Sequence, residues 1–144
     1  MVIKSVDKID LTILLDNYTD ILLESPAWME RAKRTKDNAG RLNCLTAEHG
    51  LSILIQAAGD DLESNVLLDF GTSGTALMHN LDILDISLEK VDTLVLSHGH
   101  FDHFGGLMDV KKKIDRQIPF VMHPDAVKGV RYGKKPDGTL VKKT

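Results

Sequence analysis

The segment Ser97-His98-Gly99-His100-Phe101-Asp102-His103-Phe104-Gly105-Gly106 places three imidazoles and one carboxylate within six positions. In a loop, His98 and His100 can converge on one ion, while the adjacent Asp102 and His103 can turn toward a second ion. Imidazole and carboxylate donors together suit Zn²⁺, Mn²⁺ or Fe. A chain of this composition contains the pattern by chance in about one case in a thousand. The sequence therefore predicts a metal-binding loop.

The residues on either side of this loop support the same interpretation. Thr93-Leu94-Val95-Leu96-Ser97 is short, apolar and β-branched, which is typical of a strand buried on both faces. Gly99 relaxes the backbone where the first two histidines converge, and Gly105-Gly106 lets the next segment pass close behind the ions. The alternative is a solvated, histidine-rich loop or a set of core imidazoles, which the buried strand upstream disfavours.

The remaining chain predicts a mixture of strands and helices, and hence an α/β fold. Apolar residues at the odd positions of 9–15 indicate a half-buried strand. Ser25 and Pro26 favour a short helix or an ordered loop over 25–34. Further predicted elements are a hairpin of 51–55 with 66–70, an amphipathic helix carrying Leu77, Leu81 and Leu84, a helix ending near Ile114, a strand over 118–122, and a turn at 136–138 before a return strand, 139–141, that the chain does not complete.

Composition limits the classes of protein that the chain can represent. Its 144 residues fit one domain, and 42% hydrophobic with 27% charged residues excludes disorder, collagen and coiled coil. Residues 1–110 carry 8 basic and 18 acidic side chains, whereas 111–144 carry 10 and 3. Few aromatic residues accompany the basic end, so a solvated surface is favoured over nucleic-acid binding.

Cysteine content and hydropathy give expectations about location. Cys44 is the single cysteine, so neither an intramolecular disulfide nor a thiolate zinc site is predicted. No apolar run approaches 18 residues, so no membrane partner is expected. We expect a cytoplasmic protein.

The metal-loop pattern, His98-x-His100-x-Asp102-His103, resembles the motif of the metallo-β-lactamase superfamily residue for residue. The resemblance implies a metallo-β-lactamase-like αββα sandwich, and the order of the predicted elements agrees over residues 6–132. Three further pieces resemble the branch named for the archaeal dihydropteroate-type (7,8-dihydropterin ribofuranosylaminobenzene phosphate) synthase: Glu48-His49-Gly50-Leu51-Ser52, Asp16-Asn17 and His123-Pro124.

The resemblance implies a dinuclear site and metal-assisted hydrolysis of a small-molecule ester, amide or phosphoester. His98 and His100 would ligate the first ion, and Asp102 and His103 the second, with zinc favoured over manganese or iron. Asp102 is also the residue to which a catalytic role is assigned. Two cations sharing a water lower its pKa from about 15.7 toward about 7, which supplies hydroxide at neutral pH.

Three other positions have both a functional and a structural interpretation. By the resemblance, Asp69 lies behind the ligands and orients a ligand histidine; the alternative is a turn-capping carboxylate. His49 is a weaker candidate for substrate binding, against a polar contact at a strand edge. Gly71-Thr72-Ser73-Gly74 resembles a phosphate-binding loop, although a simple strand-to-helix turn is favoured.

The resemblance also implies that part of the family's site is lacking. Its other ligands normally come from the second half of the fold, and His123, followed by Pro124, is interpreted as a strand-end residue and not as a ligand. Because sandwich domains run to roughly 200–250 residues, residues 1–144 are expected to form an incomplete, N-terminal half.

From this half we expect weak metal binding, little activity, and self-association or pairing with a complementary chain. The first hypothesis is a metal-dependent hydrolase. The alternative is a non-catalytic fragment or binding domain that needs a complementary chain. A di-iron redox site would require glutamate ligands, which the loop does not contain.

Overall fold

The computed structural model describes residues 4–32, 35–36, 39–40, 42–60, 62–128 and 131–143. Its strands are β1 (Lys8–Leu15), β2 (Thr35–Lys36), β3 (Leu42–Asn43), β4 (Ser52–Gly59), β5 (Leu62–Leu68), β6 (Thr93–Leu96), β7 (Phe120–Met122), β8 (Arg131–Lys134) and β9 (Leu140–Lys143). Its helices are α1 (Gly74–Ile83), η1 (Leu88–Lys90), α2 (Phe101–Phe104), α3 (Leu107–Lys113) and η2 (Pro124–Val127). None of the helices in these ranges has the length and apolar character that crossing a bilayer requires.

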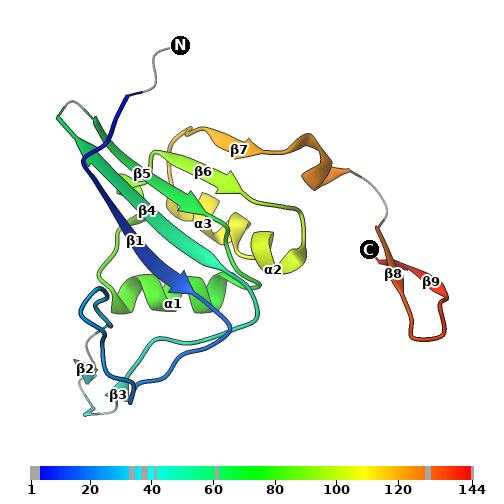
Figure 1. The fold of residues 1–144 in the computed structure, drawn as a ribbon, viewed down its shortest axis with the longest axis horizontal. Helices are drawn as coiled ribbons and strands as arrows, with labels where there is room; N and C mark the ends of the chain where they lie inside the picture. Colours follow the sequence, from blue (N-terminus) through cyan, green and yellow to red (C-terminus); the bar gives the residue numbers. More distant parts are fainter. Residues whose placement is uncertain are drawn as a thin grey trace.

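A five-stranded sheet in the order β1-β4-β5-β6-β7 forms the centre of the described chain (Figure 1). The first three strands pair antiparallel, which confirms the predicted hairpin, whereas β5, β6 and β7 pair parallel. Parallel neighbours require crossovers, and α1 with η1 provides the first while α2 with α3 provides the second. The carboxyl ends of β5, β6 and β7 therefore lie at one edge of the sheet.

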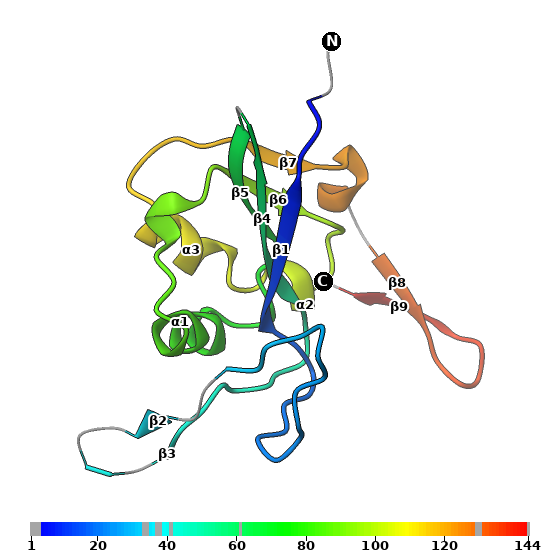
Figure 2. The ribbon, with the colours of Figure 1, turned by 60° about the vertical axis from the view of Figure 1, so that its left-hand side comes forward.

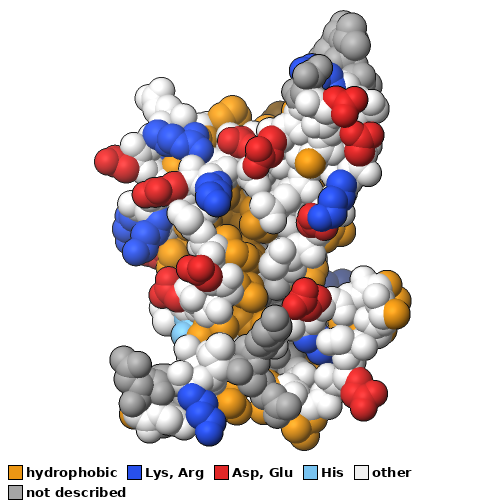
Figure 3. All heavy atoms as spheres, turned by 90° about the vertical axis from the view of Figure 1, so that its left-hand side faces the viewer, with side chains coloured by type: hydrophobic (Ala, Val, Ile, Leu, Met, Phe, Trp, Pro, Cys, Tyr) orange, Lys and Arg blue, Asp and Glu red, His pale blue; other side chains and the backbone are white. Residues whose placement is uncertain are grey.

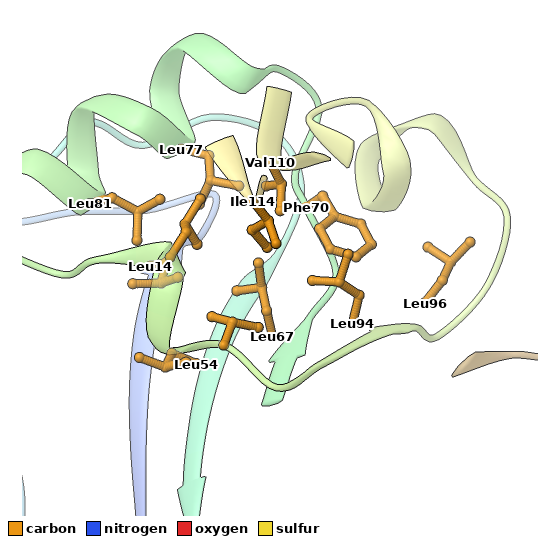
Figure 4. Close-up of a cluster of buried hydrophobic side chains, with 12 residues drawn as sticks. Leu14, Leu54, Leu67, Phe70, Leu77, Leu81, Leu94, Leu96, Val110 and Ile114 are labelled. Atoms are coloured by element: carbon orange, nitrogen blue, oxygen red, sulfur yellow. The ribbon is translucent and has the colours of Figure 1, made fainter. Parts of the chain in front are cut away.

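The hydrophobic core lies between the sheet and the helices α1 and α3, which lie on the same side of the sheet (Figure 2). Leu67 and Leu94 from the sheet point toward Leu77 of α1 and Val110 of α3 (Figure 4), and each is 3% exposed or less. Figure 3 shows the side of the molecule where apolar side chains remain visible as a band between charged groups. The sheet and the helices together confirm the predicted α/β class.

Within the described part of the chain, the opposite face of the sheet is exposed, and this corrects two predictions. Ile9, Leu11 and Ile13 are 56%, 62% and 47% exposed, so the apolar side of β1 faces away from the core. The register shifts after Ile13, which lets Leu14 and Leu15 both become buried. Strand β6 alternates between half-buried and buried positions, so the prediction of burial on both faces was wrong: helices cover only one.

Two other segments differ from the predictions. The strand expected near residues 139–141 is β9, which pairs antiparallel with β8 around the predicted turn, so its partner is present and the pairing is complete. Figure 1 shows this hairpin projecting away from the sheet. Over 25–32 the chain forms a turn in which Met29 N–H donates to the Pro26 carbonyl at 3.1 Å, an ordered loop without a helix. Lys33 and Arg34, also in that prediction, lie outside the described residues.

Candidate metal centre

The residues of the predicted centre meet at the carboxyl edge of the parallel strands. Asp69 follows β5, and His123 follows β7. The metal loop follows β6 from Ser97, and its last three residues, with Asp102 and His103, form the start of the short helix α2 and not an irregular loop as predicted. Pairing of Leu68 with Val95 and of Leu96 with Met122 brings these three strand ends side by side. Ligands of open α/β sheets commonly bind at this edge.

Asp69 is the buried anchor of the site. It is 1% exposed, and its carboxylate accepts bonds from the Ser97 N–H at 2.8 Å and the Ser97 hydroxyl at 2.6 Å. His103 Nδ1 lies 2.7 Å from Asp69 Oδ2. Because His103 Nδ1–H donates to the carboxylate, the lone pair of the neutral imidazole is left on Nε2. This contact is the one that the predicted orienting role of Asp69 requires.

Ser97 orients a second histidine in the same way. Its hydroxyl proton is donated to Asp69, so the oxygen is left to accept from His98 Nδ1, which lies 3.0 Å away. The tautomer assigned by this network leaves the lone pair of His98 on Nε2. One buried carboxylate thus fixes the orientation of two imidazoles.

The donor atoms of the predicted ligands lie in two close pairs. His98 Nε2 lies 2.9 Å from His100 Nδ1, and His103 Nε2 lies 3.6 Å from Asp102 Oδ2. Two ligands that share a tetrahedral Zn²⁺, each at about 2.0–2.1 Å, are separated by roughly 3.4 Å. The 3.6 Å pair is close to this separation, whereas the 2.9 Å pair stands at hydrogen-bonding distance and would have to move apart slightly to share an ion. The donor set of three imidazoles and one carboxylate suits the metal ions that the sequence pattern predicts.

Electrostatics favour the ligating form of His98. Partial desolvation lowers the pKa of His98, and the neighbouring His103 and His100 lower it further, while Asp69 and Asp102 oppose the shift. A lower pKa keeps the imidazole neutral at neutral pH, and only a neutral imidazole can ligate a metal.

Each pair supplies only two donors. Among the described residues, no group of three or more His, Cys, Asp or Glu side chains is arranged to hold one ion. The ligand roles of the four residues, and the expectation that further ligands come from elsewhere, remain predictions.

His49 lies beside the second pair. Its Nε2 is 3.3 Å from Asp102 Oδ2, and its ring is tilted against Phe101 with centroids 6.3 Å apart. The backbone N–H of Leu51 donates to the Asp102 carbonyl at 3.4 Å, so the 48–51 segment supports the metal loop. His49 is therefore at the site, in contact with a predicted ligand, and its role toward a substrate remains a prediction.

The glycine-containing loop before α1 is filled by a side chain of the protein itself. Glu48 accepts from the Ser73 N–H at 2.7 Å and from the Ser73 hydroxyl at 2.8 Å. A carboxylate already occupies the position that a phosphate would take at this helix terminus. The favoured interpretation of 71–74, a strand-to-helix turn, accounts for these contacts.

His123 follows β7 directly, which confirms its interpretation as a strand-end residue. It also belongs to the surroundings of the site, which the sequence interpretation did not include. It lines a hollow of about 330 Å³ together with Ser97, His98, Gly99 and His100, and Asp125 and Ala126 complete the lining. The signal that would have found it is its place directly after β7, the parallel neighbour of the strand that precedes the metal loop.

Comparison with known proteins identifies the family. A family model described as the metallo-beta-lactamase superfamily matches residues 45–127. A 7,8-dihydropterin-6-methyl-4-(beta-D-ribofuranosyl)-aminobenzene-5'-phosphate synthase of Methanocaldococcus jannaschii is 35% identical over 74% of this chain and 37% of its own length, which confirms the resemblance to that branch. A metal-dependent hydrolase of Staphylococcus aureus is 46% identical over 24% of this chain and 15% of its own length.

Among solved structures, the Rm3 metallo-beta-lactamase is similar with a TM-score of 0.43 and 25% identity, over 57% of this chain and 29% of the other. The chain spans 37% or less of the length of the curated relatives that it matches. The family model covers more than half of the 144 residues, and on that match the chain belongs to the metallo-beta-lactamase superfamily.

Proposed function

We propose that this chain supplies one part of a dinuclear metal centre in a metal-dependent hydrolase. Proteins of this superfamily generally bind divalent metal ions. The observation that carries the proposal is that two pairs of donor atoms lie at one edge of the sheet. The two atoms are 2.9 Å apart in the first pair and 3.6 Å apart in the second. Bound ions of this kind polarise a carbonyl or phosphoryl oxygen and lower the pKa of a water.

In this proposal, four residues of the chain ligate the metal ions and a fifth orients one of the ligands. His98 and His100 hold one ion, and Asp102 and His103 hold the other, with zinc the favoured metal. Asp69 keeps His103 in the tautomer whose Nε2 faces Asp102, through the contact of 2.7 Å. The match to a protein named as a metal-dependent hydrolase supports this reaction class. A small-molecule substrate and a cytoplasmic location are parts of the same proposal.

The alternative is a binding domain that becomes catalytic only with a complementary chain. Two observations favour it: each ion has only two donors within the described residues, and the chain corresponds to 37% of its synthase relative. The relative's name also indicates a synthase and not a hydrolase. Under this alternative the isolated chain binds metal weakly and hydrolyses nothing.

Metal content tests the proposal. Purified chain loaded with zinc, and its His98→Ala and Asp102→Ala variants, are dialysed and analysed for zinc by elemental analysis. His79→Ala is the matched control, because His79 lies on α1 and bonds the Cys44 carbonyl at 2.9 Å, away from the loop. We expect weakly held zinc in the unaltered chain and in His79→Ala, and a clear loss in both site variants.

Two tightly held ions that both site variants lose would indicate that further residues complete the centre, which favours the hydrolase over the alternative. Zinc binding that neither site variant changes would contradict the proposal.

A further inference from the structure

The two edges of the five-stranded sheet differ in how they are protected against pairing with another chain. Strand β7, at one edge, has three residues, with Pro119 directly before it and Pro124 two residues past its end. Strand β1, at the other edge, has eight residues and contains no proline. Short strands and prolines both keep a sheet edge from pairing. The edge at β1 has neither.

The charges on β1 do not protect its edge either. Charged side chains on an edge strand oppose pairing with a second strand, and β1 carries Lys8 and Asp10. These two side chains form an ion pair of 2.7 Å within the strand, so their charges cancel. In Figure 1, β1 forms the outer side of the sheet, and none of the described strands pairs with it on that side.

The sequence of β1 is symmetric in polarity about Leu11. Each direction from Leu11 meets first a polar residue and then an isoleucine: Asp10 and Ile9 on one side, Thr12 and Ile13 on the other. The three apolar side chains alternate with the polar ones and are exposed. A two-fold contact between identical chains requires a surface that is complementary to itself. Two antiparallel β1 strands meet this requirement.

Side-chain direction and charge select one register for such a pair. The apolar side chains of both strands share one face only if odd-numbered residues face odd-numbered ones. The register with β4 shifts after Ile13, so the regular part of the strand is 8–13 and the two-fold axis must lie near its middle. An axis at Asp10 would place two carboxylates opposite each other, which is destabilising. An axis at Leu11 avoids this contact and places Ile9 opposite Ile13.

We propose that two copies of this chain pair through β1, antiparallel and centred on Leu11, so that one continuous sheet crosses the dimer. Ile9 of each copy faces Ile13 of the other. Asp10 faces Thr12, whose hydroxyl can donate to the carboxylate. The contact goes beyond the proposed function, because β4 and β5 separate β1 from the strand that precedes the metal loop. The zinc test and the tests of this contact therefore succeed or fail separately.

Cysteine cross-linking tests the contact. Each variant carries one new cysteine in a Cys44→Ser background, because Cys44 is the single native cysteine, and is oxidised at micromolar concentration. We expect Leu11→Cys to form a disulfide-linked dimer roughly tenfold faster than Leu140→Cys, since opposite Cβ atoms of antiparallel strands are about 4.5–5.5 Å apart. Leu140 is the matched control, 65% exposed against 62% for Leu11, and lies on β9. Equal rates would overturn the proposal.

A mixture of two variants tests the register. Ile9→Cys or Ile13→Cys alone should react no faster than Leu140→Cys, because each lies four residues, or roughly 13–14 Å, from its own counterpart. Mixed in equal amounts, with one variant ¹⁵N-labelled so that mass spectrometry identifies the heterodimer, they should cross-link as fast as Leu11→Cys. Fast homodimers of both variants, without preference for the heterodimer, would indicate packing of two sheet faces and overturn the edge pairing.

Hydrogen exchange tests whether the backbone itself pairs. At a concentration that favours the dimer, every second amide of residues 8–13 should exchange more slowly than at high dilution, because alternate N–H groups of a strand point to its outer side. Packing through the open face would not select alternate amides. Unchanged exchange over 8–13, in a chain that light scattering shows to be dimeric, would overturn the proposal.

Discussion

At the scale of single residues, Asp69 has an unusual conformation that its contacts explain. Its φ is 58°, in the left-handed region that few residues other than glycine adopt. Aspartate tolerates this region better than most, and here three polar contacts to Ser97 and His103 offset the strain. The backbone turns sharply after β5, which directs the carboxylate toward the metal loop.

Substitution Asp69→Asn should disturb both the site and the fold. The amide keeps the shape but brings N–H donors where Ser97 and His103 also donate. We expect zinc affinity to fall by about 10–100-fold and the free energy of unfolding to fall by about 1–3 kcal/mol. Competition with a chromophoric chelator and urea unfolding measure the two effects. The exposed Asp115→Asn is the control, and equal zinc affinity in both variants would contradict the orienting role.

At the scale of elements, Asn80 of α1 joins three segments of the chain. Its side-chain amide donates to the Leu14 carbonyl at 2.7 Å and the Thr46 carbonyl at 2.8 Å, and its oxygen accepts from the Thr46 N–H at 2.8 Å. Asn80 is 1% exposed; its bond to Leu14 is buried, and its two bonds to Thr46 are part-buried. The segment that continues to Glu48 and Leu51 is thereby fixed beneath the metal loop.

Substitution Asn80→Ala leaves the buried Leu14 carbonyl without this partner and removes two part-buried bonds to the Thr46 backbone. We expect the free energy of unfolding to fall by about 2–4 kcal/mol, as measured by urea denaturation. His79→Ala on the same helix is the control, because that side chain is exposed and makes one bond, so its effect should stay near or below about 1 kcal/mol. Similar losses in both variants would show that Asn80 has no special role.

Gly50 fixes the contact between its segment and the metal loop. Its φ is +134°, and a Cβ there would overlap the Asp102 carbonyl oxygen. Gly50→Ala should therefore lower stability by about 2 kcal/mol or more and should displace Asp102, weakening zinc binding. The matched control is Gly40→Ala, which has φ +76° but open space around its Cβ. Zinc binding unchanged in Gly50→Ala would contradict the coupling of this segment to Asp102.

The sequence predicted those parts of the site that depend on local spacing. His98, His100, Asp102 and His103 lie within six positions, so their chemistry was visible without the fold. The position of His123 near this site could not be predicted in the same way, because it depends on the parallel register between β6 and β7.

The difference between local spacing and the pairing of distant segments also explains the errors in the predicted fold. Alternation correctly placed a strand over 9–15, but a period of two cannot tell which face of a sheet the helices cover. That is why the strand was predicted to be half-buried, although its apolar residues Ile9, Leu11 and Ile13 are exposed. Pairing of β8 with β9 likewise depends on residues that lie apart in the sequence.

At the scale of the whole molecule, the open sheet face should govern behaviour in solution. Strand β1 lies at the edge of the sheet, and the side chains it exposes on this face are apolar. Val121 on β7, at the other edge, is 53% exposed. Exposed apolar surface next to an unpaired strand edge favours association with other chains. The predicted partners, a second copy or a complementary chain, would both bury this face.

We therefore expect the isolated chain to self-associate, with a mass by light scattering above 16.0 kDa at micromolar concentration. Leu11→Glu should shift the population toward monomer, because a charge on the open face opposes its burial. Leu140→Glu is the control: Leu140 is 65% exposed, close to the 62% of Leu11, but lies on the projecting hairpin. A monodisperse monomer of the unaltered chain, or equal effects of the two substitutions, would show that this face does not drive association.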